Sequence, residues 1–222
     1  MESYIKQEMP IIPEGIITPS EEDMGKKVLI ATLYSPEPVI LAATRLGQDI
    51  IILLIDKEPN KEQEASVKLI QESLGKVIEV KVIKTDVYDI VEVAKKCVEI
   101  IDMQHKDDHI FINITSGRKT KAIGLLFAAY CRHDKVSKIA YNPEDNGQVI
   151  YLPRLSFKLT ESQKEILEAL EKGKYETIGE LADKVKTSTA MVYRAIDELK
   201  DMDLITTDDG IKLTDAGKIA RL

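Results

Sequence analysis

The sequence predicts an α/β domain with a mostly parallel sheet, followed by a smaller, mainly helical domain. Between residues 27 and 152, short runs rich in Val, Ile and Leu alternate with helical patterns, as in consecutive βαβ units. After Pro153 the alternation stops, and capped helices and a short hairpin follow. The chain of 222 residues is long enough for two domains. We assign three segments: an N-terminal arm at 1–24, the α/β domain at 25–155 and the helical domain at 156–222.

The first half of the α/β domain contains three apolar runs with β-branched residues. They are expected to form strands at residues 27–33, 49–55 and 76–83. The first two runs are apolar throughout, which indicates burial on both faces, whereas the third alternates with polar residues and is expected nearer a sheet edge. The helices between them are expected at residues 39–46 and 62–74, where Gly47 and Gly75 end them.

The second half continues the pattern. Asp86 is expected to cap a helix that ends near Met103. A fourth strand at residues 110–114 leads through a polar turn, Thr115 to Lys119, into another helix. The last two strands are expected at 136–141 and 148–152, joined as a hairpin by the turn at 142–147.

Alternating strands and helices imply right-handed crossovers and helices on both faces of the sheet. In such sheets, ligands bind beyond the carboxyl ends of the strands, where the strand order reverses. Two polar loops meet this description: residues 34–38 after the first strand and residues 115–119 after the fourth. We expect them to face each other across one crevice.

The charge around the second of these loops favours an anion. Residues 110–133 contain no Asp or Glu but four basic residues, Arg118, Lys119, Lys121 and Arg132, in a chain whose formal net charge is -7. The first amide groups of the following helix add a positive dipole end. The spacing fits neither a GxxxxGK[ST] phosphate loop nor GxGxxG. The alternative is an ordinary strand-to-helix turn with solvated basic side chains.

The sequence of the C-terminal domain predicts three helices and a hairpin. Thr160 and Gln163 form an expected capping box, Thr177 caps a second helix, and Thr187 or Ser188 caps a third. Residues 204–213 have two strand-like arms around an Asp-Gly turn, and Thr214 caps a last short helix. This order predicts a winged helix-turn-helix, whose third helix enters the DNA major groove.

The balance of 11 basic and 14 acidic residues from Phe157 onward does not by itself indicate DNA binding. Residues 184–196, however, contain three basic residues and no acid. The candidate contacts to phosphates or base edges are Lys186, Ser188, Thr189, Tyr193, Arg194 and Lys212. The alternative is a winged helix used only for dimerisation or protein contact.

Net charge, cysteine spacing and the length of apolar runs limit the classes of protein to which this chain can belong. The net charge of -7 and a pI near 5.2 exclude a protein that coats nucleic acid by bulk charge, so any DNA contact must be local. Cys97 and Cys131 lack metal-ligand spacing and are expected to be reduced core thiols, and no metal or cofactor is expected. No apolar run approaches the roughly 20 residues of a membrane helix, and no secretory signal opens the chain, so we expect a cytoplasmic protein.

These residues together resemble a known family. An α/β domain of the Rossmann type, with Asn113, Ile114, Thr115, Gly117 and Lys119 after its fourth strand and a C-terminal winged helix, is similar to the CRISPR-associated Rossmann-fold (CARF) transcription regulators of archaea. Two positions depart from the usual pattern of that turn. Ser116 replaces a glycine and Arg118 replaces a small polar residue.

The resemblance implies a homodimer that binds a cyclic oligoadenylate, most often the tetra-adenylate, and regulates CRISPR loci by binding double-stranded DNA. The implied ligand-binding residues are Thr32, Leu33, Tyr34, Ser35, Asn113, Thr115, Ser116, Gly117, Arg118 and Lys119. Two alternatives stay open. The chain could cleave the ring as a slow ring nuclease, although no general base is evident, or it could sense a different nucleotide with the same crevice.

Overall fold

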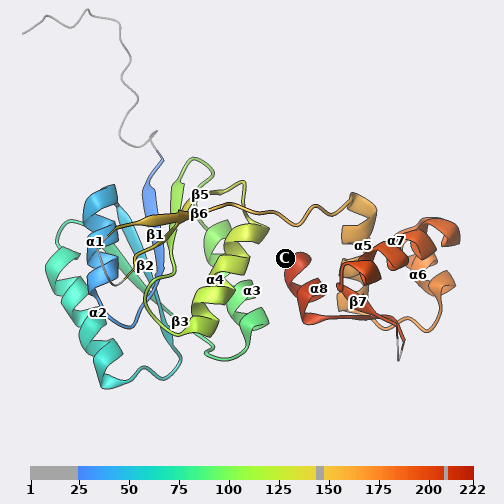
Figure 1. The fold of residues 1–222 in the computed structure, drawn as a ribbon, viewed down its shortest axis with the longest axis horizontal. Helices are drawn as coiled ribbons and strands as arrows, with labels where there is room; N and C mark the ends of the chain where they lie inside the picture. The colour runs from blue at the N-terminus through green and yellow to red at the C-terminus, as the bar shows by residue number, and fades with distance from the viewer. Residues whose placement is uncertain (1–24, 144–147, 208–209) are drawn as a thin grey trace, which may run out of the picture.

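The structure is a computed structural model that describes residues 25–143, 148–207 and 210–222. Figure 1 shows two bodies, an α/β domain and a helical domain, connected by an extended segment that follows β6. The predicted N-terminal arm, most of the turn at 142–147, and Asp208 and Asp209 of the predicted hairpin turn lie outside the described residues.

A six-stranded sheet forms the centre of the first domain. Its strands are β1 (Lys27–Thr32), β2 (Ile50–Asp56), β3 (Glu79–Thr85), β4 (His109–Asn113), β5 (Val136–Tyr141) and β6 (Ile150–Leu152). Their order across the sheet is β3-β2-β1-β4-β5-β6, and every pair is parallel except the antiparallel β5 and β6. This is a Rossmann-like order, so the predicted fold class and the terminal hairpin are confirmed.

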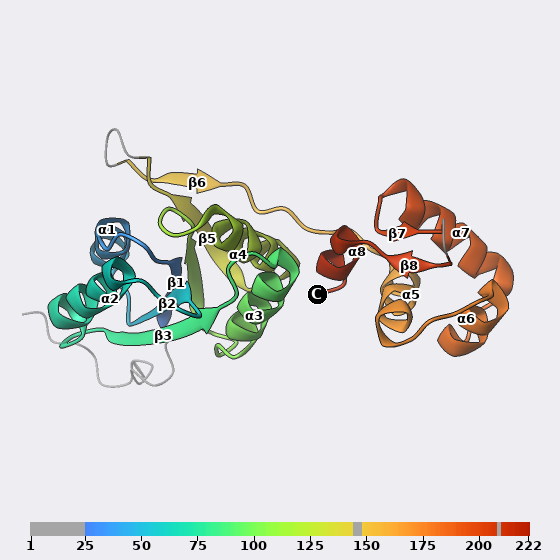
Figure 2. The same ribbon diagram turned by 90° about the horizontal axis from the view of Figure 1, so that it is seen from below.

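Helices cover both faces of this sheet, as Figure 2 shows. The four are α1 (Glu37–Leu46), α2 (Lys61–Leu74), α3 (Ile90–Asp102) and α4 (Lys119–Cys131). Alternate residues of β1 serve opposite cores: Val28 and Ile30 pack in the core under α3 and α4, whereas Leu29 and Ala31 pack in the core under α1 and α2. Residues 28–31 of β1 are all apolar because both faces of this strand are buried.

Several predicted boundaries differ from those of the structure. Asp86 does not cap α3. The cap is Asp89, whose carboxylate accepts a hydrogen bond from the Glu92 N–H, while Asp86 stabilises the turn before it. The third strand covers residues 79–85 rather than 76–83, although its predicted place at an edge is confirmed. Helix α1 begins two residues early, because a proline fits the first turn of a helix.

The second domain contains the predicted helices and hairpin. Its elements are α5 (Glu161–Lys172), α6 (Ile178–Val185), α7 (Thr189–Asp201), β7 (Ile205–Thr206), β8 (Lys212–Leu213) and α8 (Asp215–Ala220). The capping box of Thr160 and Gln163 is present, and Ser188 rather than Thr187 caps α7. A core separate from that of the sheet joins α5, α6, α7 and β7.

The end of the chain returns to the first domain. Helix α8 packs against α3 and α4, and Leu222 packs against the core under those helices. The Cys131 thiol, at the end of α4, donates a hydrogen bond to the carbonyl oxygen of Ile219 across 3.2 Å. The Arg132 guanidinium donates another to the Leu222 carbonyl oxygen. The two domains are therefore joined by side-chain contacts as well as by the connecting segment.

Candidate functional site

The two polar loops singled out by the sequence lie at the point where the strand order reverses. Strands β1 and β4 are neighbours in the sheet, and the chain leaves them toward opposite edges. The loop after β1 and the turn after β4 therefore meet at the carboxyl edge, where open α/β sheets bind ligands.

Ser116 ties these two loops together. Its hydroxyl oxygen accepts hydrogen bonds from the backbone N–H groups of Tyr34 and Ser35, both across 2.8 Å, and its O–H donates to the Ser35 carbonyl oxygen across 3.0 Å. The hydroxyl of Thr32 donates to the Ser116 carbonyl oxygen. The loops are thus in direct contact rather than facing each other across an open crevice, because the hydroxyl of Ser116, in the turn after β4, satisfies backbone groups of the loop after β1.

Gly117 gives the turn its shape. Its φ angle is +94°, a conformation that residues with a side chain rarely adopt. A Cβ atom at this position would lie 3.1 Å from the Thr32 Cβ and 3.3 Å from the Leu33 nitrogen. A glycine is therefore required on two independent grounds, the backbone angle and the close approach of β1.

Asn113 holds the start of the turn and is fully buried. Its side-chain oxygen accepts from the Thr115 N–H across 3.0 Å, and its amide nitrogen donates to the Asn142 side-chain oxygen across 2.9 Å. The Asn142 N–H in turn donates to the Thr115 hydroxyl across 2.8 Å. Sequence reasoning missed Asn142, although its position directly after β5 places it at the same sheet edge.

A buried ion cluster lies under the other side of the turn. The carboxylate of Asp56, at the end of β2, accepts from Arg118 Nε across 2.8 Å and from the Lys121 ammonium. Lys121 is completely buried, whereas the Arg118 side chain is 45% exposed. Burial raises the pKa of Asp56, but hydrogen bonds and charge from Lys121 and Arg118 outweigh it, so this pKa lies below its ordinary value.

Because of this cluster, the turn exposes fewer unpaired basic side chains than the sequence predicts. Lys121 and Arg118 share the Asp56 carboxylate, and Arg132 pairs with Asp102 across 2.9 Å. Within the described part of the chain, Lys119 is exposed and its ammonium has no partner. No side chain caps α4, so its first amide groups also point out unpaired. The positive end of α4, Lys119 and the accessible part of Arg118 form the exposed cationic surface of the turn.

A groove of about 630 Å³ lies beside the turn. Its lining residues come from α1 and from the ends of β1, β4 and β5: Ser35, Glu37, Pro38, Ile40, Leu41, Thr44, Thr115, Asn142 and Pro143. The groove combines an aliphatic wall with hydroxyl and amide groups. Such a surface suits a flat, partly apolar group that carries hydrogen-bonding atoms.

The predicted ligand-binding residues are gathered in one place but divide into two groups. Thr32, Leu33, Asn113 and Ser116 are buried and their polar groups bond to the protein, so they support the turn from beneath. The residues at or near the surface are Tyr34, Ser35, Thr115, Gly117, Arg118 and Lys119. The hydroxyl of Tyr34 donates to the Glu62 carboxylate of α2, and Tyr34 is not among the residues that line the groove.

The predicted DNA-contacting residues lie on an exposed part of the second domain. Lys186, in the turn before α7, and Ser188, Thr189, Tyr193 and Arg194, at its start, are all exposed. Thr189 and Tyr193 are four residues apart and so share one helical face. The Ser188 hydroxyl accepts from the Met191 N–H across 3.3 Å, which makes it primarily a helix cap. Lys212 is exposed on β8.

Comparison with protein families identifies the first domain. A family model described as HFX_2341_N-like, N-terminal, matches residues 28–146, more than half of the chain. The chain belongs to the HFX_2341_N-like family. A second model, for winged helix-turn-helix DNA-binding domains, matches residues 159–206 of this family member. The predicted architecture of a Rossmann-like domain followed by a winged helix is confirmed, whereas an archaeal source is not shown by these matches.

Solved structures resemble this HFX_2341_N-like protein at low identity. Can2 from Sulfobacillus thermosulfidooxidans, in complex with cyclic tetra-adenylate, is 14% identical with a TM-score of 0.45, over 87% of this chain and 62% of Can2. Csm6 from Enterococcus italicus, bound to cyclic hexa-2′-fluoro-hexa-dAMP, is 15% identical with a TM-score of 0.48, over 81% of this chain and 55% of Csm6. The chain thus spans less than two thirds of either protein. A search of curated proteins found no match.

Two further features concern the described residues of this family member. None of its described helices has the length and apolar character to cross a membrane. No group of three or more His, Cys, Asp or Glu side chains in the described ranges is placed to hold a metal ion. Cys97 is buried in the sheet core, and burial raises the pKa of its thiol to about 12.

Proposed function

We propose that this protein is a ligand-responsive transcription regulator of CRISPR loci. It binds a cyclic oligoadenylate, the tetra-adenylate, at a dimer of its CARF-like domains, and it binds DNA through the winged helix. The observation that carries the proposal is the turn after β4. It combines a glycine at φ +94°, the uncapped start of α4 and the exposed Lys119 at the switch point of the sheet.

The chemistry of the turn supports a phosphate-containing ligand. Unpaired amide groups and a free ammonium attract a phosphate oxygen, while Arg118 keeps part of its guanidinium exposed beside them. The groove next to the turn has aliphatic and hydroxyl groups that suit a base and its ribose. A ring with internal two-fold symmetry fits a symmetric dimer, in which each chain contributes the same turn.

The winged helix supports the second half of the proposal. The side chains of Lys186, Thr189, Tyr193 and Arg194 are exposed at the start of α7, the part of a recognition helix that contacts base edges. The ligand changes DNA binding only if it binds one arrangement of the two domains better than another.

Native mass spectrometry tests the ligand. The full chain is mixed with cyclic tri-, tetra- and hexa-adenylate and followed for an hour. We expect one intact tetra-adenylate per two chains. Linear products would assign the protein to the ring nucleases instead, and a complex with another nucleotide alone would keep the regulator but change its ligand.

Gel mobility shift then tests the DNA half. The duplex is selected from a random library by the full chain, and its affinity is measured with and without the ring. We expect the ring to change that affinity. If the ring binds but the DNA affinity stays the same, the regulatory half of the proposal is overturned.

A further inference from the structure

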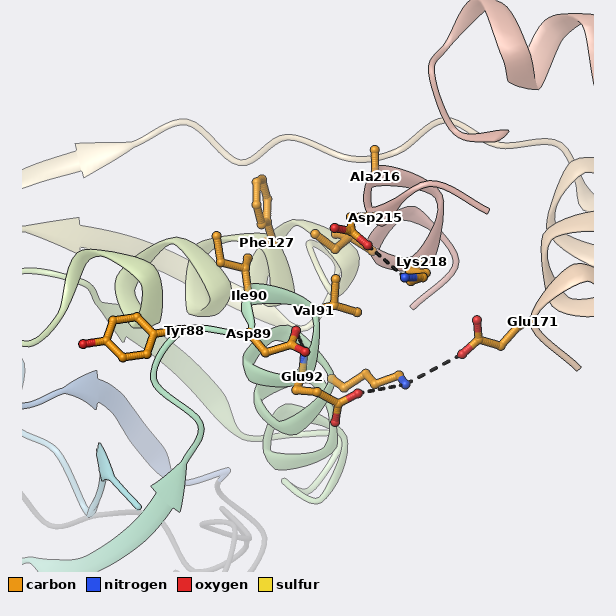
Figure 3. Close-up of a pocket in the computed structure, with 12 residues that line it drawn as sticks. Tyr88, Asp89, Ile90, Val91, Glu92, Phe127, Glu171, Asp215, Ala216 and Lys218 are labelled. Atoms are coloured by element: carbon orange, nitrogen blue, oxygen red, sulfur yellow. Dashed lines mark hydrogen bonds and ion pairs between the residues drawn. The ribbon is translucent and has the colours of Figure 1, made fainter. Parts of the chain in front are cut away.

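A cavity of about 790 Å³ separates the two domains (Figure 3). One wall comes from α3, the segment before it and Phe127 of α4. The other wall comes from Glu171 of α5 and from α8. The apolar lining residues include Val91 of α3 and Ile219 of α8. The two domains touch where α8 packs against α3 and α4, and the cavity lies beside that contact.

The charged side chains around the cavity pair with one another. The Lys95 ammonium lies 3.2 Å from the Glu92 carboxylate and 3.7 Å from that of Glu171, so it connects α3 to α5. Lys218 pairs with Asp215 across 2.9 Å within α8. Because these charged side chains pair with one another, they do not by themselves indicate a charged ligand in the cavity.

The segment before α3 links this cavity to the ligand turn. The Thr120 hydroxyl, in the first turn of α4, donates to the Val87 carbonyl oxygen. The Arg118 guanidinium lies 5.9 Å from the centre of the Tyr88 ring, and Tyr88 also lines the cavity. The Asp86 carboxylate accepts from the N–H groups of residues 87, 88 and 89, which makes this segment a single rigid turn.

Arg118 is the exchangeable member of the buried ion cluster. It is 45% exposed, whereas Lys121 is fully buried, and both bond to Asp56. An anion that attracts Arg118 would leave Asp56 still paired with Lys121. The same movement would take the guanidinium away from the Tyr88 ring, which is itself 76% exposed and held by little else.

We propose that the Lys95–Glu171 ion pair is a latch between the two domains, and that the ligand turn controls it through the Val87–Tyr88 segment. This inference rests on the proposed function for the identity of the ligand only. Anion binding at the turn draws Arg118 from Tyr88, the segment before α3 shifts, and the ion pair across the cavity opens. The winged helix then changes its orientation about the contact that α8 makes with α3 and α4.

The latch is expected to bias an equilibrium by a modest factor. The side chains of Lys95 and Glu171 are 35% and 28% exposed, so solvent screens the pair. Pairs of this kind shift equilibria by about twofold to fivefold. This is enough to broaden a distance distribution, and too little to separate the domains.

The test measures the distance between the domains by double electron–electron resonance. Spin labels are attached at Glu72→Cys on α2 and Asp197→Cys on α7, in a Cys131→Ser background that retains a donor to Ile219. Cys97 is buried and stays in place. Labelled chain is diluted with a large excess of unlabelled chain, so that only distances within one chain are read.

Lys95→Gln and Glu171→Gln are each expected to broaden the distance distribution. The population of chains with the ion pair open, seen as a second distance between the labels, should change by about twofold to fivefold. Glu171 also pairs with Arg221 across 3.3 Å, so the double variant should change the distribution no more than Glu171→Gln alone. The control is Lys172→Gln, which removes an ion pair with Glu168 inside α5 and should leave the distribution unchanged. An unchanged distribution in both latch variants overturns the latch.

Control by the turn is tested with and without ligand. Thr120→Val, which removes the hydrogen bond to Val87, should broaden the ligand-free distribution as the latch variants do; no change overturns the link. Cyclic tetra-adenylate should shift the wild-type distribution toward the distance seen in Lys95→Gln. If mass spectrometry shows the ring bound and the distance does not move, the control by ligand is wrong. If the ring does not bind, the proposed ligand is wrong. The measurements on the variants without ligand still test whether the Lys95–Glu171 pair is a latch.

Discussion

The turn after β4 and the start of α7 are both basic surfaces in an acidic chain, but they are built in opposite ways. Around the turn, most polar groups bond inward, and Ser116, Asn113 and Asp56 fix one geometry. At the start of α7, the predicted DNA contacts are exposed, and among them Ser188 caps the helix. A fixed cradle favours a ligand of defined shape, whereas long exposed side chains adapt to a charged polymer.

The difference makes the two surfaces sensitive to different changes. Substitutions around the turn should affect stability and ligand binding together, because the same hydrogen bonds serve both. Substitutions on the outer face of α7 should affect DNA binding with little change in stability.

Asp56→Asn is expected to have the largest effect on stability. It leaves the buried Lys121 without a carboxylate, which costs about 3–5 kcal/mol of the free energy of unfolding, measured by urea denaturation at pH 7. The matched control is Asp102→Asn, which also removes a carboxylate from two cations but at a 35% exposed side chain. It should cost less than about 1 kcal/mol. Equal losses in the two variants would contradict the buried cluster.

The same variant predicts a pH dependence. The pKa of Asp56 is lower in the folded protein than its ordinary value, so its contribution to stability is complete above that ordinary value and is lost as the pH falls through the folded one. The difference in unfolding free energy between the wild type and Asp56→Asn should therefore be constant above about pH 4 and shrink below it. A difference that grew in acid would show that another group is responsible.

Lys119→Glu should lower ligand affinity by about a hundredfold, because it exchanges a cation for an anion at the phosphate site. The unfolding free energy should change by less than about 0.5 kcal/mol, since this side chain is exposed. Isothermal titration with cyclic tetra-adenylate measures the affinity. Lys106→Glu, an exposed lysine at the opposite edge of the sheet, is the control and should bind as the wild type does.

Gly117→Ala should cost about 1–3 kcal/mol of stability, because a side chain is strained at φ +94° and its Cβ approaches Thr32. Thermal unfolding measures this loss. Gly179→Ala is the contrasting variant: it lies in α6 with nothing closer than 3.8 Å to the added atom, and it should stabilise the chain by about 0.5–1 kcal/mol. If both substitutions stabilised the protein, the conformation assigned to the turn would be wrong.

Arg194→Ala should weaken DNA binding about tenfold and leave ligand binding and stability unchanged. If Arg194 contacts a phosphate, the slope of log affinity against log salt should also fall by about one. Lys200→Ala is the control, because it removes the same charge from the far end of α7. An unchanged mobility shift for Arg194→Ala would contradict the assignment of α7 to the DNA-binding surface.

The backbone of the site was predictable from sequence because it follows from local patterns. The apolar runs predict β1 and β4, the turn residues predict the start of α4, and Thr160 with Gln163 predicts the capping box. These features depend on residues close together in the chain. The predicted place of β3 at a sheet edge was likewise readable from its alternation.

The partners of the charged side chains were not predictable in this way. Asp56 and Lys121 are 65 positions apart, and the pattern around Lys121 gives no sign of complete burial. Counting the four basic residues after β4 therefore overestimated the exposed charge of the turn. The direction of Tyr34 was missed for the same reason, because its partner Glu62 belongs to another element.

The winged helix domain is attached at both of its ends. Its first residues follow the connecting segment from β6, and its last residues, through α8 and Leu222, rest on the first domain. A body attached at two points cannot tumble as one on a single tether does. Short attachments keep the facing surfaces at millimolar effective concentration. Contacts far too weak to join two separate molecules can therefore set the orientation of α7, and small changes in them suffice to alter it.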